Sequence, residues 1–292
     1  MMAEKQGLIV KAKYGVFTII SDDITYECKK RGSLSKDKKN LLVGDIVNFD
    51  DEDLMIFDVK ERHSHLIRPN IANVDQMIII FSLIEPEFSY YLALKYVTYA
   101  NKYHIPSILI LTKEDKNVSK EKINEIVETF NKLSIPVYSV SNKTGEGLDK
   151  VRPLFKEKTT CLIGQSGVGK SSLLNALDPS FKRSEGSYSE ALGRGRHETK
   201  EVVLLKYQDG FIADTPGFSS LDLNLYKEDL AKYFPGFEER SNDCYFTDCL
   251  HISEKNCQVK KDLMEGKIPQ IAYDTYLKLS NDAISYIRRF QK

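Results

Sequence analysis

The stretch that decides the fold is Gly164-Gln165-Ser166-Gly167-Val168-Gly169-Lys170-Ser171, which matches the phosphate-binding pattern G-x-x-x-x-G-K-[ST] at every position. The apolar run at 160–163 predicts a buried strand before it, and 172–177 predicts a helix that starts directly after it. Glycines let the backbone turn its N–H groups toward a polyphosphate, and the helix N-terminus adds the positive end of its dipole. We therefore expect this loop, together with Ser172, to bind the phosphates of a nucleotide.

Two side chains of this loop and one downstream motif have the chemistry of a magnesium–phosphate site. Lys170 is expected to reach the β- and γ-phosphates, and the Ser171 hydroxyl to coordinate Mg²⁺. The motif Asp214-Thr215-Pro216-Gly217 follows an apolar strand predicted at 211–213. We expect the Asp214 carboxylate to hold Mg²⁺, directly or through water, and the Gly217 N–H to contact a γ-phosphate.

The segment between these motifs, residues 181–200, is rich in glycine, serine and arginine, and we expect a mobile loop there. GTPases place a threonine in this region whose hydroxyl completes the Mg²⁺ shell, and Thr199 is predicted to fill that role. Many GTPases orient the attacking water with a glutamine directly after D-x-x-G, but here that residue is Phe218. His197 is the nearest side chain able to orient water, so we predict it as the catalytic residue. A solvated or RNA-contacting histidine is the alternative.

Two further loops carry residues suited to a guanine base. Thr112-Lys113-Glu114-Asp115 follows the apolar run at 109–111 and resembles the guanine-binding motif N-K-x-D, with threonine in place of asparagine. The Asp115 carboxylate can accept hydrogen bonds from the N1–H and N2 amino groups, and the Lys113 stem can pack on the base plane. Ser141-Asn142-Lys143 follows the next predicted strand, where GTPases have a second base-contacting loop. An ordinary charged turn at 112–115 is the alternative.

A cluster of potential metal ligands lies in the C-terminal part of the chain. Its members follow the pattern C-x4-C-x-H-x5-C at Cys244, Cys249, His251 and Cys257. Three thiolates and one imidazole form the donor set of a closed structural zinc site, which stabilises a small, loop-rich unit. Unligated thiols or a redox pair are the alternatives. Cys28 and Cys161 fall in predicted strands, where cysteine acts as a small buried hydrophobe.

Composition and charge exclude several classes of protein. Lysine plus arginine and aspartate plus glutamate both number 42, so any basic surface must be local. The longest uncharged apolar stretch, 77–84, is too short to cross a bilayer, and the N-terminus lacks the apolar region of a signal peptide. Five cysteines are too few and too unevenly placed for a disulfide framework. These features predict a soluble cytoplasmic protein without membrane contact, and we expect it to be a monomer.

The N-terminal part, residues 1–66, is predicted to be a small β-barrel. Apolar and polar residues alternate with a period of two over 8–20, and further short strands follow between turn signals. Several short strands in so few residues favour an OB-fold. A basic loop between two strands suits contact with a nucleic-acid backbone, although a solvated loop is the alternative. Its cations are Lys29, Lys30, Arg31, Lys36, Lys38 and Lys39.

Residues 67–222 change to apolar strands that alternate with amphipathic helices, which indicates a mostly parallel sheet covered on both faces. In an ordinary GTPase the phosphate loop comes first and the base-reading loops come last. Here the order is reversed, so we expect a circularly permuted P-loop domain whose site is the same in three dimensions. Residues 223–292 are predicted to form a helical zinc-binding domain, with a final helix over 273–290.

Taken in order, the motifs TKxD, SNK, GxSGVGKS, GRGRHxT, DTPGF and C-x4-C-x-H-x5-C resemble those of the ribosome small-subunit-dependent GTPase A family. The resemblance covers essentially the whole chain, because that family also has an N-terminal OB-fold. It implies GTP hydrolysis stimulated by the small ribosomal subunit, with contacts to its rRNA and a role late in its maturation. Two positions depart from the family pattern, Thr112 for asparagine and Glu198 for threonine.

The expected protein is thus a three-domain GTPase that uses GTP, Mg²⁺ and one structural zinc ion. The barrel and the zinc domain would bind rRNA, while the GTPase domain times binding and release. One alternative is an RNA-binding protein whose nucleotide site only regulates its affinity for RNA. Measuring GTP turnover with and without ribosomal subunits would distinguish such a protein from an enzyme. Another is an ATP-using P-loop enzyme such as a small-molecule kinase, but the sequence has no motif for an acceptor pocket.

Overall fold

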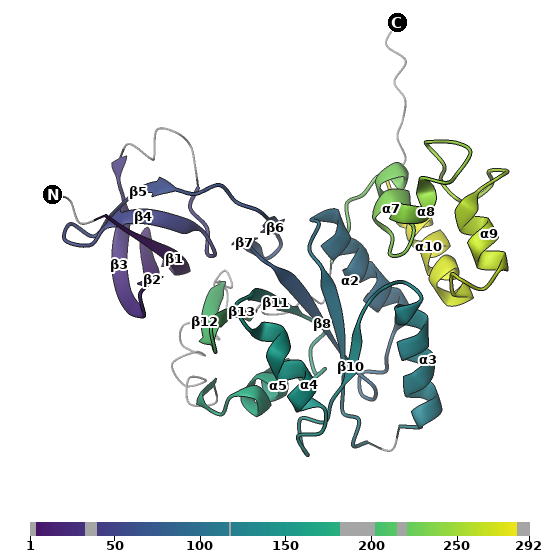
Figure 1. Ribbon diagram of the computed structural model, residues 1–292, viewed down its shortest axis with the longest axis horizontal. Helices are drawn as coiled ribbons and strands as arrows, with labels where there is room; N and C mark the ends of the chain where they lie inside the picture. Colours follow the sequence, from purple (N-terminus) through teal and green to yellow (C-terminus); the bar gives the residue numbers. More distant parts are fainter. Residues whose placement is uncertain (1–3, 33–39, 117, 182–201, 215–220, 285–292) are drawn as a thin grey trace, which may run out of the picture. The chain divides into compact units, whose positions relative to one another are not determined.

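The computed structural model describes residues 4–32, 40–116, 118–181, 202–214 and 221–284 (Figure 1). The chain forms two compact units, each built from segments that are separate in sequence. The first unit comprises Met1–Met77, Leu148–Ile163 and Lys170–Gly217. The second comprises Ile78–Gly147, Gly164–Gly169 and Phe218–Lys292.

The first unit begins with a five-stranded barrel, which confirms the predicted OB-like fold (Figure 1). Its strands lie in the order β1-β2-β3-β5-β4, and a further pairing of β1 with β4 closes it. Alternation places Ile9, Ile19 and Phe49 inside, where all three side chains are fully buried. The strands are β1 (Glu4–Lys13), β2 (Val16–Ser21), β3 (Ile24–Lys30), β4 (Ile46–Asp50) and β5 (Met55–Val59).

The remainder of the first unit holds the strands and helices around the phosphate loop. Strand β11 (Thr159–Ile163) is parallel to β13 (Gly210–Asp214), and β12 (Val203–Tyr207) is antiparallel to β13. Strand β12 also pairs with β1 of the barrel, with Val203 opposite Lys11. The described part of the unit also holds a short hairpin and helical segments: β6 (His65–Ile67), β7 (Asn70–Ala72), α4 (Leu148–Val151), η1 (Arg152–Phe155) and α5 (Lys170–Leu177).

The second unit contains the strands that carry the predicted base-binding loops. They lie in the order β10-β9-β8, and β10 is parallel to β9. Strand β8 is buried along its whole length, as a strand covered on both faces should be. Helices α2 and α3 begin at the N-caps Ser89 and Ser119, whose hydroxyls accept hydrogen bonds from Leu92 and Lys122. The bounds are β8 (Gln76–Ser82), α2 (Tyr90–Lys102), β9 (Ser107–Thr112), α3 (Lys120–Asn131) and β10 (Val137–Ser139).

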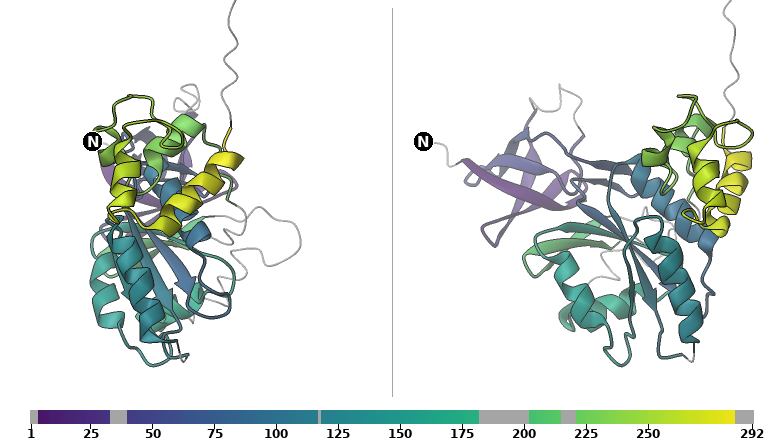
Figure 2. Two further views of the ribbon diagram at one scale, coloured as in Figure 1. Left: turned by 90° about the vertical axis from the view of Figure 1, so that its right-hand side faces the viewer. Right: turned by 45° about the vertical axis from the view of Figure 1, so that its right-hand side comes forward.

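Four short helices form the C-terminal part of the second unit, and α10 packs along α2 (Figures 1 and 2). Their core is aromatic, with the ring of Tyr276 4.9 Å from Phe237 and 5.3 Å from Phe234. The last helix starts earlier than predicted and ends at Asp282, because Ala283 is already extended. The helices are α7 (Lys227–Tyr233), α8 (Glu238–Ser241), α9 (Gln258–Met264) and α10 (Gln270–Asp282). No helix among the described residues is long and apolar enough to span a membrane.

Candidate functional site

The predicted phosphate loop, Gly164–Gly169, joins the end of β11 to the first residue of α5, Lys170. The backbone at Gly164 lies so close to its neighbours that a Cβ atom there would be 2.4 Å from the carbonyl oxygen of Ile80. At Gly169 the φ angle is +94°, which favours glycine. Ser171 and Ser172 are exposed in the first turn of α5, and Lys170 is half-buried. The loop therefore has the strand–loop–helix geometry that exposes backbone N–H groups at a helix N-terminus.

Side chains from both predicted base-binding loops contact the phosphate loop directly. Thr112, at the end of β9, donates its hydroxyl to the carbonyl oxygen of Val168 at 2.5 Å. The side-chain amide of Asn142, which follows β10, donates to the carbonyl oxygen of Gly169 at 3.3 Å. Three stretches that are far apart in sequence are thus brought to one place.

Asp115 and Ser141 are also brought together. The Ser141 hydroxyl donates to the Asp115 carboxylate at 2.9 Å and accepts the backbone N–H of Thr144 at 3.1 Å. These bonds fix the carboxylate, which remains exposed to solvent. Lys113 has a φ angle of +65° and donates its ammonium group to the carbonyl oxygen of Glu85.

The remaining residues of these two loops are placed nearby. Glu114 accepts a hydrogen bond at 2.6 Å from Ser139 of β10, a partner that sequence reasoning missed. No signal in the sequence marks Ser139, because it is one polar residue at the end of a short strand. Lys143 lies exposed in the turn that begins at Ser141, and the Gly145 N–H closes this turn by donating to the Ser141 carbonyl.

The predicted magnesium and catalytic residues are only partly described. Asp214 ends β13, opposite Leu162 of the parallel strand β11. The carboxyl ends of these two strands therefore lie at the same edge of the sheet, where α/β proteins bind ligands. The side chain of Asp214 and the whole of Gly217, Thr199 and His197 lie outside the described residues.

The Cys/His cluster fits a zinc ion. The four potential ligand atoms of Cys244, Cys249, His251 and Cys257 all lie within 4.8 Å of one another. The His251 Nδ1 is 3.3 Å from the Cys257 sulfur and 3.7 Å from the Cys244 sulfur, and these two sulfurs are 4.0 Å apart. Tetrahedral zinc, with Zn–S of about 2.3 Å and Zn–N of about 2.0–2.1 Å, places its ligand atoms roughly 3.5–3.8 Å apart.

The surroundings of the cluster suit metal binding as well. Burial lowers the pKa of His251 to about 4, so its imidazole is neutral and offers a lone pair at pH 7. The other ring nitrogen, Nε2, lies 3.1 Å from the Ser241 hydroxyl, which leaves Nδ1 facing the sulfurs. Burial raises the pKa of Cys249 to about 12, so a metal ion is needed to displace its proton. Backbone N–H groups of Gln258 and Lys260 point at the Cys244 and Cys257 sulfurs.

Sequence reasoning missed the side chains that hold the loop around His251. The hydroxyls of Tyr273 and Tyr276 on α10 donate to the carbonyl oxygens of His251 and Leu250 at 2.7 and 2.5 Å. Glu254 accepts the backbone N–H groups of the same loop at 2.8 and 2.9 Å. The helical spacing of the two tyrosines indicates only a shared face, so their partners could not be found without the fold.

Comparison with known proteins agrees with this architecture. Residues 59–224 match the RsgA GTPase family and residues 6–55 match the RsgA N-terminal domain. The small ribosomal subunit biogenesis GTPase RsgA of Bacillus subtilis (strain 168) is 37% identical over 289 residues, which covers 95% of this chain and 97% of that protein. The protein of the same name from Staphylococcus saprophyticus is 37% identical and covers 98% of this chain and 100% of its own length.

Two solved structures are similar over nearly the whole chain. YjeQ from Thermotoga maritima is 31% identical with a TM-score of 0.83, covering 96% of this chain and 98% of its own. YloQ, described as a circularly permuted GTPase, is 34% identical with a TM-score of 0.81, covering 96% and 94%. GTP, GDP and Mg²⁺ are the ligands that this kind of enzyme implies. The protein is therefore a circularly permuted GTP-hydrolysing enzyme that belongs to the RsgA GTPase family.

Proposed function

We propose that this GTPase is stimulated by the small ribosomal subunit and acts, as a cytoplasmic monomer, late in the maturation of that subunit. The names of its relatives, small ribosomal subunit biogenesis GTPases, support this assignment. The observation that carries its GTPase part is the direct contact of both base-binding loops with the phosphate loop, through Thr112 and Asn142. The arrangement counts against the ATP-using alternative, because Asp115 presents an acceptor suited to the two donors of guanine.

In this proposal each stretch has one task. The loop Gly164–Gly169 and the first turn of α5 bind the phosphates, with Lys170 against the β- and γ-phosphates. Asp115 and the turn at 141–143 bind the base. Mg²⁺, held by Ser171, Asp214 and Thr199, neutralises charge on the phosphates when it is bound. His197 orients the attacking water, a role that rests on the sequence alone.

Contact with rRNA is proposed for the barrel. Lys29 and Arg31, at the end of β3 and just beyond it, are exposed on the barrel. Phosphate-backbone contact needs such cations on a small barrel. The other cations of the basic loop, Lys36, Lys38 and Lys39, lie outside the described residues.

Residues 221–225, which follow the D-x-x-G motif, are bonded through their backbone carbonyl groups to helices of the second unit. These bonds support coupling between the nucleotide state and the C-terminal helices. Lys102 of α2 donates its ammonium group to the carbonyl oxygen of Leu223 at 2.9 Å. Ile284, just beyond α10, donates its N–H to the carbonyl oxygen of Leu225 at 3.0 Å. Burial lowers the pKa of Lys102. The segment is thus fastened to α2 on one side and to the end of α10 on the other.

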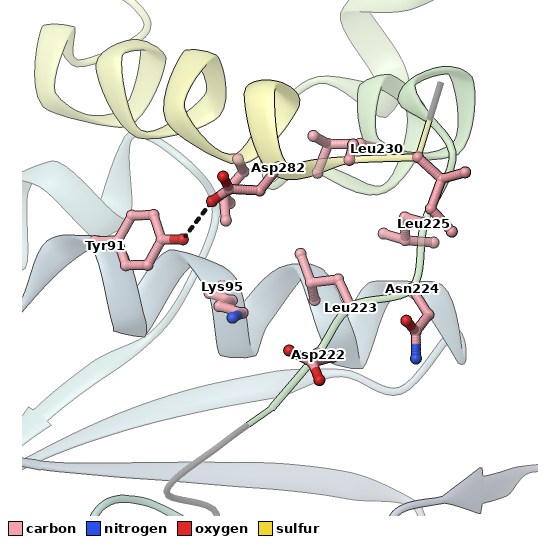
Figure 3. Close-up of a pocket in the computed structure, with 11 residues that line it drawn as sticks. Tyr91, Lys95, Asp222, Leu223, Asn224, Leu225, Leu230 and Asp282 are labelled. Atoms are coloured by element: carbon pink, nitrogen blue, oxygen red, sulfur yellow. Dashed lines mark hydrogen bonds between the residues drawn. The ribbon is translucent and has the colours of Figure 1, made fainter. Parts of the chain in front are cut away.

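Figure 3 shows the residues that line a pocket between this segment, α2 and α10. A cavity of about 150 Å³ separates part of the segment from α2 and α10, and one hydrogen bond of 3.3 Å, from Tyr91 to Asp282, crosses beside it. Leu225 and Leu230 are buried on its wall. Because residues 223–225 are bonded to both α2 and the end of α10, a shift of this segment is expected to move the C-terminal helices.

The proposed timing is tested by sedimenting the protein with purified small subunits. With a non-hydrolysable GTP analogue most of the protein is expected to co-sediment, and with GDP the bound fraction should fall about tenfold, a typical allosteric coupling. Large subunits serve as the control and should retain little protein in either state. Equal retention on small subunits with the two nucleotides would contradict nucleotide-timed release.

A further inference from the structure

The base-binding motif lacks the asparagine that normally opens it, and the structure shows what stands in its place. Thr112 is fully buried, and its Oγ1 lies 2.5 Å from the Val168 carbonyl oxygen and 3.2 Å from that of Phe81. A hydroxyl carries one hydrogen, so it can donate to only one of them, and the shorter contact assigns the hydrogen to Val168. Thr112 therefore holds one carbonyl of the phosphate loop, where an asparagine amide would have two hydrogens to donate.

Asn142 supplies a second donor at the next carbonyl. Its Nδ2 lies 3.3 Å from the carbonyl oxygen of Gly169. That oxygen can only accept, so the orientation of the amide is fixed with nitrogen toward the loop. A Cβ atom built on Gly169 would lie 3.3 Å from Asn142 Nδ2 and 3.5 Å from Thr112 Oγ1, so both side chains converge on this one residue.

The side-chain oxygen of Asn142, at the other end of the amide, is also informative. The Oδ1 of Asn142 is buried and has no hydrogen-bond partner among the described residues. A buried amide oxygen without a partner costs free energy, so this side chain is held in place at some expense. A glycine, alanine or serine at position 142 would avoid that cost. The amide is therefore better explained by what its nitrogen does at Gly169.

We propose that Asn142 is a positioning residue that shares with Thr112 the work of holding the phosphate loop in its binding conformation. The peptide group is planar and trans, so its N–H points away from its C=O. Anchoring the carbonyls of Val168 and Gly169 therefore aims the N–H groups of Gly169 and Lys170 away from both side chains. These are N–H groups of the loop that the proposed function assigns to the phosphates, so the inference rests on that function.

The first test measures GDP affinity with a fluorescent GDP analogue. Asn142→Ala is expected to weaken binding about threefold to tenfold, the effect of one lost hydrogen bond to a backbone carbonyl. Thr112→Asn in the Asn142→Ala background should restore the affinity to within about twofold of the wild type, because one asparagine then supplies two donors. Asn131→Ala, at the exposed end of α3, is the matched control and should bind GDP as the wild type does.

A second readout needs no nucleotide. Amide hydrogen exchange of residues 168–171 in the nucleotide-free protein should be faster in Asn142→Ala and unchanged in Asn131→Ala, with the rest of the protein exchanging as in the wild type. Wild-type GDP affinity in Asn142→Ala, or failure of Thr112→Asn to rescue it, would overturn the inference. A wild-type protein that binds no GDP would instead overturn the proposed function, and the exchange of residues 168–171 would still decide whether Asn142 holds the loop.

Discussion

Replacing Cys249 with serine is expected to release the zinc ion and unfold the C-terminal helices. Binding of structural zinc contributes about 10–16 kcal/mol in small zinc domains, which is as large as the whole stability of a typical domain. Helices α8 and α9 are short, and the loop between them, residues 242–257, carries all four ligands, so this part of the chain has only a small core of its own. The aromatic cluster of Phe237 and Tyr276 packs against His251, so loss of the metal exposes it.

The measurement is the zinc content of protein purified without added zinc, followed by far-ultraviolet circular dichroism and limited proteolysis. The wild type should hold one zinc per chain, and Cys249→Ser close to none, with cleavage gained between 238 and 270. Cys161→Ala, in the buried strand β11, is the control because it removes a thiol away from the cluster and should keep the metal. A Cys249→Ser protein with one full equivalent of zinc would show that the cluster is not the metal site.

Asp115→Asn is expected to reverse the base preference of the enzyme. The carboxylate can accept two hydrogen bonds from guanine, and bonds of this charge-assisted kind contribute about 1.5–3 kcal/mol each. Affinity for GTP and GDP should therefore fall by about 10²- to 10⁴-fold. The new amide offers a donor where xanthine has a carbonyl oxygen, so xanthine nucleotides should bind better than guanine nucleotides. Ser141 still donates to the side-chain oxygen of residue 115, which keeps the amide in place.

Competition of GDP, XDP and ADP against a fluorescent nucleotide measures this preference. Asp149→Asn, an exposed aspartate on α4, is the matched control and should leave the order unchanged. If Asp115→Asn binds GDP as the wild type does, the base is read elsewhere. Equal affinity of the wild-type protein for ADP and GDP would also contradict the assignment of Asp115 to guanine recognition.

Much of the fold could be predicted because its signals are local. The phosphate loop needs glycine at Gly164 because a Cβ atom there would meet the backbone, and at Gly169 because its φ angle is positive. These requirements appear in the sequence as glycines at fixed positions. Alternation with a period of two predicts the barrel, since each strand has one buried face. The C-x4-C-x-H-x5-C spacing predicts the zinc cluster, because four ligands within one short stretch can close on one ion.

Local signals did not predict every helix boundary. Residues 148–155 are helical, but they divide into α4 and the 3₁₀ helix η1, because Pro153 near the start of η1 has no N–H to continue the α-helical pattern. The final helix was predicted to continue to 290, since its apolar residues keep helical spacing. It ends instead at Asp282, and Ile284 uses its N–H to pair with Leu225.

The meeting of the base-binding and phosphate loops could be predicted from their motifs, but the individual contacts between distant segments could not. Nothing near Asn142 in the sequence reveals that its amide reaches Gly169, because the two residues meet only after the sheet forms. The hydrogen bond from Lys102 to the carbonyl oxygen of Leu223 could not be predicted either, because the sequence does not distinguish this lysine from the other lysine of α2. Such contacts hold the loops of the candidate site and attach Leu223 to α2.

The most direct test of the proposed function is the rate of GTP hydrolysis by the purified protein alone, with small ribosomal subunits and with large subunits. Turnover is expected to be slow for the protein alone, to increase at least about tenfold with small subunits and not to increase with large subunits, because a partner then completes the GTPase site. Turnover that is the same with and without small subunits would contradict the proposed function.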